Sequence, residues 1–324
     1  MDALSEVVRL ARLSGTVLLD VHAHGSWCVA VPAGASSARM YAHVVVEGEC
    51  RLKAGNEDPI LLESGDFALV TRGEAHLVGS DLEANAASLA SLLRPPVAGD
   101  LEAVTLGAGG SRTRWLALAF ACDRHLAEPL LTELPAVLRV DLRGSDALRW
   151  LSESLGFSLS VSDAPRAGAG ATAARLSELA LVEALRRHVQ GLPRGGTGWL
   201  AGLNDRYVGR ALALVHGRPG EDWSVEKLAR QVGLSRSTLA ERFSEVMGEP
   251  VIAFLTRWRL QLAAEELLNT PRTIAAIAHG AGYESAGAFS FAFKRAFGKP
   301  PSVWRKKGKK GVRALLMKRA LTPF

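Results

Sequence analysis

Residues 235–247 carry side chains that can contact a nucleic acid. Arginine and hydroxyl side chains donate hydrogen bonds to phosphate oxygens or base edges, and a glutamate can accept one from the amino group of a cytosine. In a helix with Leu239, Phe243 and Val246 pointing inward, the start and the opposite face present Arg236, Ser237, Thr238, Ala240, Glu241 and Arg242. A solvated Glu241 paired with Arg236 or Arg242 explains that acid equally well.

A second stretch, residues 285–297, has a less polar outward face. With Phe289 and Phe293 inward, its start and outward positions hold Ser285, Ala286, Gly287, Ser290, Phe291, Lys294 and Arg295. Phe291 cannot donate to a base, but its ring can contact the methyl group of a thymine. We therefore expect the first helix to select the sequence and the second to anchor it through Lys294, Arg295 and the backbone.

The two stretches belong to one repeated pattern. Val225, Leu228, Ala229 and Gly233 recur as Ile274, Ile277, Ala278 and Gly282, and Ser235, Leu239, Phe243, Gly248 and Pro250 recur as Ser285, Phe289, Phe293, Gly298 and Pro300. In each copy a hydroxyl residue, Ser224 or Thr273, is placed to cap a short helix that stops near the glycine, and a serine caps a second helix. The pattern predicts two helix-turn-helix units.

The apolar segment 250–268 predicts one long helix that holds the two units at a fixed separation. Two helices on one rigid body could enter successive major grooves of double-stranded DNA, which lie roughly 34 Å apart. A helical domain that only duplicates a packing unit, or that binds protein, is the alternative.

Residues 203–306 resemble the DNA-binding domain of AraC-type transcription regulators. The stretches that carry the resemblance are SVEKLARQVGLSRSTLAERF and TIAAIAHGAGYESAGAFSFAFKRAFGKPPSVWRK. The resemblance implies sequence-specific binding to promoter DNA, with RNA polymerase as a partner if the protein activates transcription.

Between Thr16 and about His76, short β-branched and apolar runs alternate with Gly, Asn, Asp and Pro clusters. This spacing predicts an antiparallel sandwich or barrel, preceded by a short helix at residues 4–13. The runs DALSEVVRLARLSGTVLLD, HVVVEGECRL and LESGDFALVTRGEAH resemble the cupin-type sensor domain of one branch of the same family. The expected fold is therefore α+β in two domains, a cupin-like antiparallel β-domain followed by an all-α double helix-turn-helix.

Many cupins hold a metal ion through histidines and a carboxylate, and His76 stands at the ligand position of the second cupin motif. In the first motif Tyr41 replaces the glutamate ligand. His43 and Glu47, at even spacing on a strand, offer a substitute pair, but we favour no metal, no cofactor and no catalytic residue. The side chains that could line an effector pocket are Trp27, Tyr41, His43 and His76, although core packing explains them equally well.

The connector between the domains contains a helical stripe of Leu176, Leu179, Val182 or Glu183, Leu185 and Val189. Packing against its own chain and forming a homodimer are equally good interpretations. We expect a sensor domain at residues 1–135, a helical connector with a dimerisation helix as one alternative at 136–202, a DNA-binding domain at 203–306 and a basic tail at 307–324.

Charge and cysteine content restrict the class of protein. Residues 1–203 hold 18 basic and 23 acidic residues, whereas residues 204–324 hold 21 basic and 10 acidic ones, so that only the second part suits a polyanion. Three widely spaced cysteines without a CxxC pair suit a reducing cytosol, and no apolar run reaches membrane length. We expect a cytoplasmic, effector-responsive transcription regulator; a metal-dependent cupin enzyme fused to a DNA-binding domain and a nonspecific nucleoid-type binder are the alternatives.

Overall fold

The computed structural model describes residues 3–10, 13–34, 39–93, 103–122, 124–146, 149–150, 153, 169–193 and 195–306. By contacts, the chain forms two compact units. The β-unit consists of Ala11–Arg124 and Leu130–Leu192, and the helical unit consists of Met1–Leu10, His125–Pro129 and Pro193–Phe324. The predicted boundaries remain a prediction, and the basic tail lies outside the described residues.

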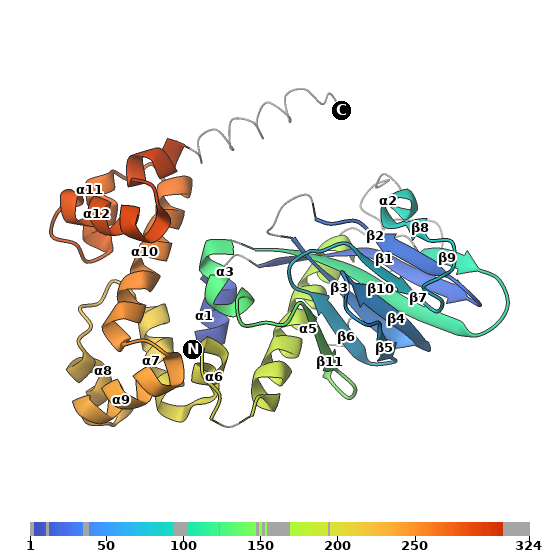
Figure 1. Ribbon diagram of the computed structural model, residues 1–324, viewed down its shortest axis with the longest axis horizontal. Coiled ribbons are helices and arrows are strands. Elements are labelled where there is room, and N and C mark those ends of the chain that lie inside the picture. Colours follow the sequence, from blue (N-terminus) through green and yellow to red (C-terminus); the bar gives the residue numbers. More distant parts are fainter. Residues whose placement is uncertain are drawn as a thin grey trace. The chain divides into compact units, whose positions relative to one another are not determined.

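The described part of the β-unit contains two sheets (Figure 1). The six-stranded sheet has the order β11-β6-β3-β10-β1-β9, with bounds Val137–Asp141, Asp66–Val70, Arg39–Glu47, Arg112–Ala121, Ser14–His24 and Ala103–Gly107. The five-stranded sheet has the order β5-β4-β7-β2-β8, with bounds Ile60–Glu63, Glu49–Ala54, His76–Gly79, Cys28–Val31 and Ala87–Ser88, and is followed by the short helix α2 (Leu89–Leu92). Strand pairs are antiparallel except β1–β9 and β2–β8.

One apolar core takes side chains from both sheets. Leu19 and Val21 of the larger sheet and Leu52 and Val78 of the smaller one are at most 1% exposed and belong to the same cluster. The predicted β-domain is therefore confirmed as a sandwich with open edges and not as a closed barrel.

The other face of the larger sheet is covered by the long helix α5 (Ala169–Gly191), which packs against β1 and β11. A Cβ atom at Gly15 would lie 2.3 Å from Ser177 Oγ, so only glycine allows this close approach of helix to strand. The predicted stripe was wrong in one respect. Leu179 is 38% exposed, whereas Ala180, Leu181 and Ala184 are buried, because small residues allow the helix to lie close to the sheet.

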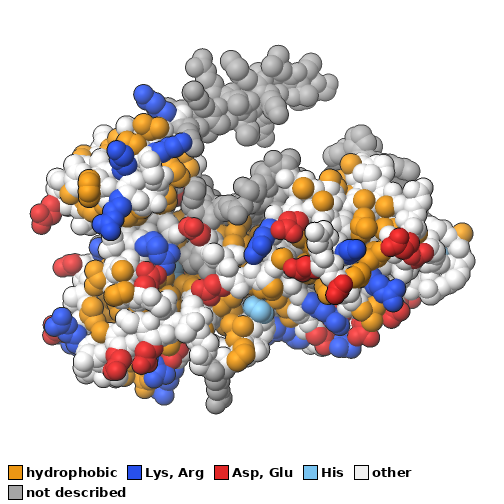
Figure 2. Space-filling view, in the orientation of Figure 1, with side chains coloured by type: hydrophobic (Ala, Val, Ile, Leu, Met, Phe, Trp, Pro, Cys, Tyr) orange, Lys and Arg blue, Asp and Glu red, His pale blue; other side chains and the backbone are white. Residues whose placement is uncertain are grey.

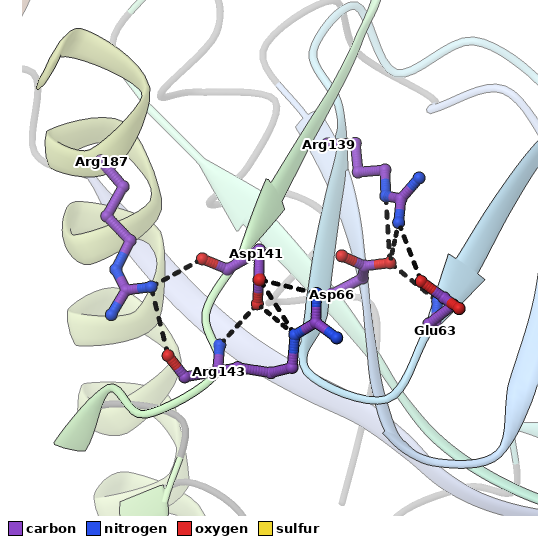
Figure 3. Close-up of polar contacts among 6 residues, drawn as sticks. All are labelled: Glu63, Asp66, Arg139, Asp141, Arg143 and Arg187. Carbon is purple, nitrogen blue, oxygen red and sulfur yellow. Dashed lines mark hydrogen bonds and ion pairs between the residues drawn. The ribbon is translucent and has the colours of Figure 1, made fainter. Parts of the chain in front are cut away.

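Polar contacts fix α5 to the sandwich at two places. Arg187 Nη1 donates to the backbone oxygens of Asp141, at 2.7 Å, and of Arg143, at 3.4 Å (Figure 3). The amide of Gly15 donates to Glu178 Oε1 at 3.1 Å. Packing of this helix against its own chain is thus present, whereas its role in a homodimer stays a prediction.

The helical unit contains the paired helix-turn-helix pattern. Its helices are α1 (Ala3–Leu10), part of α3 (Arg124–Leu131), α6 (Trp199–Asn204), α7 (Arg206–Gly217), α8 (Val225–Val232), α9 (Arg236–Met247), α10 (Val251–Asn269), α11 (Ile274–Gly280) and α12 (Ala286–Phe297). Among the helices that the structure describes, none is both long and apolar enough to span a membrane.

The predicted helix starts are confirmed by their hydrogen bonds. Ser224 and Thr273 accept from the amides three residues on in α8 and α11, and Ser235 and Ser285 do the same in α9 and α12. Between the helices of each pair the glycines adopt the left-handed conformation, with φ of 83° at Gly233 and 81° at Gly282. Each cap satisfies an amide that has no partner within its helix.

Candidate nucleic-acid interface

We call α9 and α12, the second helices of the two helix-turn-helix units, the first and the second recognition helix. The helix α9 exposes the polar face expected from the sequence. Arg236, Ser237 and Thr238 are exposed, and Ser235 Oγ lies 3.1 Å from Ser237 Oγ and 2.8 Å from Thr238 Oγ1. Ala240 is half-buried and Glu241 is exposed. The face therefore combines a guanidinium, hydroxyls and a carboxylate, which can hydrogen-bond phosphates and base edges. On the inward side Met247, and not Val246, is the third buried residue.

Arg242 has a different environment from the other members of this face. Its Nη2 and Nε lie 2.7 and 2.9 Å from Asp205 Oδ2, and its guanidinium carbon lies 5.4 Å from the ring centroid of Tyr207. Asp205 also caps α7 by accepting from the amides of Tyr207 and Val208. This arrangement fixes α9 to the start of α7, so Arg242 holds the recognition helix in position. Sequence reasoning missed Asp205, since a partner 37 residues away leaves no local pattern.

Replacing Asp205 by Ala should lower the free energy of unfolding by about 1–2 kcal/mol, because α7 loses its cap and Arg242 its partner. Asp205→Asn should retain most of the stability, since asparagine also caps helices. Burial of the Asp205 carboxylate raises its pKa, but hydrogen bonds from Arg242 and two amides outweigh this and lower it overall. Its contribution is therefore present at neutral pH and lost as the pH falls through this lowered pKa.

Urea unfolding of wild type, Asp205→Ala and Asp205→Asn at neutral and acidic pH measures these differences. Equal stability of wild type and Asp205→Ala at neutral pH would contradict the positioning role.

The second recognition helix, α12, is centred on an exposed aromatic ring. Phe291 is 75% exposed, and Gly287, Lys294 and Arg295 are exposed around it. Ala286 and Ser290 are half-buried, and the Ser290 hydroxyl donates to Ala286 O at 2.7 Å. Ala288 is also exposed; sequence reasoning did not include it, although its spacing of three residues from Phe291 places it on the same face.

A buried aromatic cluster packs against the inward side of α12. Phe293 is fully buried, and its ring centroid lies 5.4 Å from Phe289, 4.5 Å from Phe297 and 5.8 Å from Trp304. Because Phe289 and Phe293 are four residues apart, both point away from the exposed face. The predicted inward pair is confirmed.

The two helix-turn-helix units differ in charge. Residues 224–249 contain four basic and four acidic residues, whereas residues 273–306 contain five basic residues and one acidic residue. Figure 2 shows Lys and Arg side chains over the part of the helical unit that contains α11 and α12. Phosphate attraction should therefore be stronger at the second unit.

The predicted effector residues come together inside the sandwich. Trp27 stacks on Trp115 with ring centroids 5.8 Å apart, and His43 lies 5.2 Å from Trp115 and 4.9 Å from His76. Tyr41 lies 5.7 Å from His76. The register explains the meeting, because His43 of β3 pairs with Ala117 of β10, two residues after Trp115. Trp115, which sequence reasoning missed, joins the predicted residues into one aromatic group.

Hydrogen bonds define the tautomers of the two histidines. His76 Nδ1 lies 2.8 Å from the carbonyl oxygen of Glu74 and therefore donates, so Nε2 of the neutral ring accepts from His43 Nε2 at 2.7 Å. Burial lowers the pKa of both rings, and for His43 the neighbouring His76 adds to the effect. His43 Nδ1 then carries a lone pair. Among the described residues, it and the indole N–H groups of Trp27 and Trp115 have no hydrogen-bond partner.

Glu47 does not join this group. The pairing of β3 with β10 shifts between Glu47 and Val45, so that a bulge cancels the even spacing from His43 to Glu47. The Glu47 side chain is 51% exposed and lies 3.5 Å from Arg112. In the residues that the structure covers, no three His, Cys, Asp or Glu side chains converge in a way that could hold a metal ion.

Comparison with known proteins covers both units. Residues 2–190 match the family described as Cupin, and residues 228–307 match the family described as Helix-turn-helix domain. A protein of Streptomyces antibioticus named "Putative AraC-like transcription regulator" is 33% identical over 309 residues, which cover 94% of this chain and 99% of that protein. The HTH-type transcriptional regulator AlkR of Acinetobacter baylyi is 29% identical over 94% of this chain and 99% of its own length.

Among solved structures, an AraC-type transcriptional regulator from Chromobacterium violaceum is 26% identical, with a TM-score of 0.30, over 31% of this chain and 88% of that one. The family matches and the full-length relatives agree with a cupin-type β-unit followed by helix-turn-helix units. The chain belongs to the AraC-type transcription regulators that carry an N-terminal cupin domain, and it is a DNA-binding regulator of transcription.

Proposed function

We propose that the protein binds double-stranded promoter DNA by placing α9 and α12 in two successive major grooves. This proposal rests on one observation. Each helix is capped at its start, packed on one side and exposed on the other, and α10 joins the two helix-turn-helix units. The proposed contact residues are Arg236, Ser237, Thr238, Ala240, Glu241, Ser285, Ala286, Gly287, Ser290, Phe291, Lys294 and Arg295, with Arg242 positioning α9.

The two helices have unequal roles. The face of α9 carries a guanidinium, hydroxyls and a carboxylate that can distinguish base edges. The face of α12 has an aromatic ring at its centre and cations at its end, on a unit with a surplus of basic residues. Hence α9 specifies the operator, while α12 anchors the protein and contributes an apolar contact to a thymine methyl group.

The sandwich interior is the proposed effector site. Trp27, Tyr41, His43 and His76 form a buried group with Trp115. Three polar atoms of this group, His43 Nδ1 and Nε1 of both indoles, have no hydrogen-bond partner among the described residues. A small uncharged molecule that offers both a donor and an acceptor would satisfy His43 Nδ1 and the two indoles. The protein acts as a cytoplasmic regulator without catalytic activity. A homodimer through α5, and RNA polymerase as a partner in activation, complete the proposal.

Base substitutions across the operator test the unequal roles. Substitutions under α9 should each weaken binding by about 1–3 kcal/mol, and those under α12 by less, except at one thymine. Phe291→Ala should cost about 1 kcal/mol, or roughly fivefold in Kd, on the natural operator and nothing on an operator with uracil at that position, which lacks the methyl group.

Operators are first obtained by genome-wide mapping of bound sites, and affinities are then measured by fluorescence anisotropy at fixed salt. Arg236→Ala serves as the matched variant on α9. Equal losses at both half-sites would contradict the unequal roles, and equal affinity for operator and random DNA would contradict sequence-specific binding altogether.

A further inference from the structure

Two segments that adjoin the β-unit in sequence belong to the helical unit. They are the N-terminal helix α1 and residues 125–129 of α3. Strand β1 follows α1, and strand β10 precedes α3. The two strands pair antiparallel, with Ser14 opposite Ala121, so both segments leave the same end of one ladder. A displacement of that ladder end would act on both segments together.

The helix α1 packs against α7. Its Val7 is fully buried. Its Glu6 is only 3% exposed and accepts a hydrogen bond of 2.6 Å from Arg9 Nη2. The helix α7 in turn packs against α9 and, through Asp205, binds Arg242 on that recognition helix. A single helix therefore separates α1 from the first recognition helix.

The second segment contacts the helix that joins the two helix-turn-helix units. Glu128 Oε2 accepts a hydrogen bond of 3.0 Å from Nε2 of Gln261, which lies on α10 and is 2% exposed. Beside Glu128, Leu126 and Ala127 are each 2% exposed. A buried amide on the connecting helix thus depends for its donor contact on a residue that follows β10, the strand that carries Trp115.

We propose that α1 on α7 and Glu128 on Gln261 together couple the state of the β-unit to operator binding. Seating of these segments orders α7 and α10 and so holds both recognition helices ready for DNA. Pre-ordering lowers the entropic cost of binding. By linkage, operator binding favours the seated state. An effector that binds the seated and unseated states with different affinities changes operator affinity, and the operator changes effector affinity by the same factor. This inference rests on the proposed promoter binding and names its regulation.

Variants of the full-length chain test the polar contact. Glu128→Ala should weaken operator binding by roughly fivefold, because Gln261 is left with an unsatisfied buried amide. In a Gln261→Leu background, which removes that amide, the same Glu128→Ala change should weaken binding much less than it does in wild type. A fivefold loss in both backgrounds, or in neither, would overturn the proposed route through Gln261.

The apolar contact is tested by Val7→Asn, with Ser5→Asn on the exposed side of the same helix as the matched control. Val7→Asn should weaken operator binding severalfold and Ser5→Asn should leave it unchanged. Tighter binding by Val7→Asn would mean that seating inhibits, which contradicts the proposed direction, and unchanged binding would remove α1 from the coupling. If Val7→Asn does not fold, as judged by circular dichroism, the Glu128 and Gln261 variants decide.

Wild-type protein is measured in parallel on operator and random DNA. If it does not distinguish them, the proposed function fails. If it does and every variant binds the operator as wild type does, only the coupling fails.

Discussion

Replacing Phe293 by Ala should lower the free energy of unfolding of the helical unit by about 3–5 kcal/mol, the usual cost of deleting a buried aromatic side chain. Phe293 is fully buried and contacts the rings of Phe289, Phe297 and Trp304. Its loss would leave a cavity beneath α12, and the second recognition helix would lose its support. We therefore expect the second half-site to be bound no more tightly than random DNA.

Phe291→Ala is the matched control, because it makes the same chemical change two residues away on the same helix. Phe291 is 75% exposed, so its removal should alter the free energy of unfolding by no more than about 0.5 kcal/mol. Urea unfolding followed by circular dichroism measures both variants. Equal destabilisation by the two changes would contradict the orientation of α12, and with it the exposed face on which the proposed DNA contacts depend.

Lowering the pH from 7 to 5 should destabilise the helical unit by about 2 kcal/mol through His216 alone. Burial, with a smaller effect of Arg257, lowers the pKa of His216 to about 3. The unfolded chain binds this proton near pH 6.5, whereas the folded protein does not. The stability contributed by the neutral ring is therefore complete above about pH 6.5 and decreases by about 1.4 kcal/mol per pH unit down to about pH 3.

His216→Gln removes this titration and keeps an acceptor for the indole N–H of Trp199, which donates to His216 Nε2 at 3.2 Å. The variant can be less stable than wild type at pH 7, since His216 also packs 4.3 Å from the ring centroid of Trp258. The decisive quantity is the difference in slope between the two proteins from pH 7 to 5, because His43 and His76 titrate equally in both. Parallel slopes would contradict a neutral, buried His216.

The helix-turn-helix units could be predicted almost completely from the sequence, because their determinants are local. A hydroxyl residue that caps a helix and a glycine with positive φ both act within a few residues, and the repeat presents each twice. The inward pairs of α9 and α12 follow from helical spacing alone. Phe291 was likewise placed outward by its spacing from Phe289 and Phe293, and it is 75% exposed.

Features that depend on distant partners could not be predicted. The spacing of Arg242 suggests a DNA contact, which stays a prediction, whereas its ion pair with Asp205, 37 residues away, leaves no pattern in the sequence. The even spacing of His43 and Glu47 suggests that both side chains lie on one face of the strand. A bulge between them, visible only in the pairing with β10, breaks this alternation. The buried side of α5 is set by small residues that meet the sheet, so the larger Leu179 is left exposed. The membership of α1 in the helical unit has no sequence signal, since the helix directly precedes β1.

The joint between α5 and the sandwich affects how freely the sequence can diverge. Arg187 donates to the main-chain oxygens of Asp141 and Arg143, not to their side chains (Figure 3). Every amino acid supplies such an oxygen, so mutations at positions 141 and 143 can accumulate while the acceptors remain. At this contact, selection for a particular side chain therefore acts on Arg187, which donates, and not on the two residues whose main-chain oxygens accept.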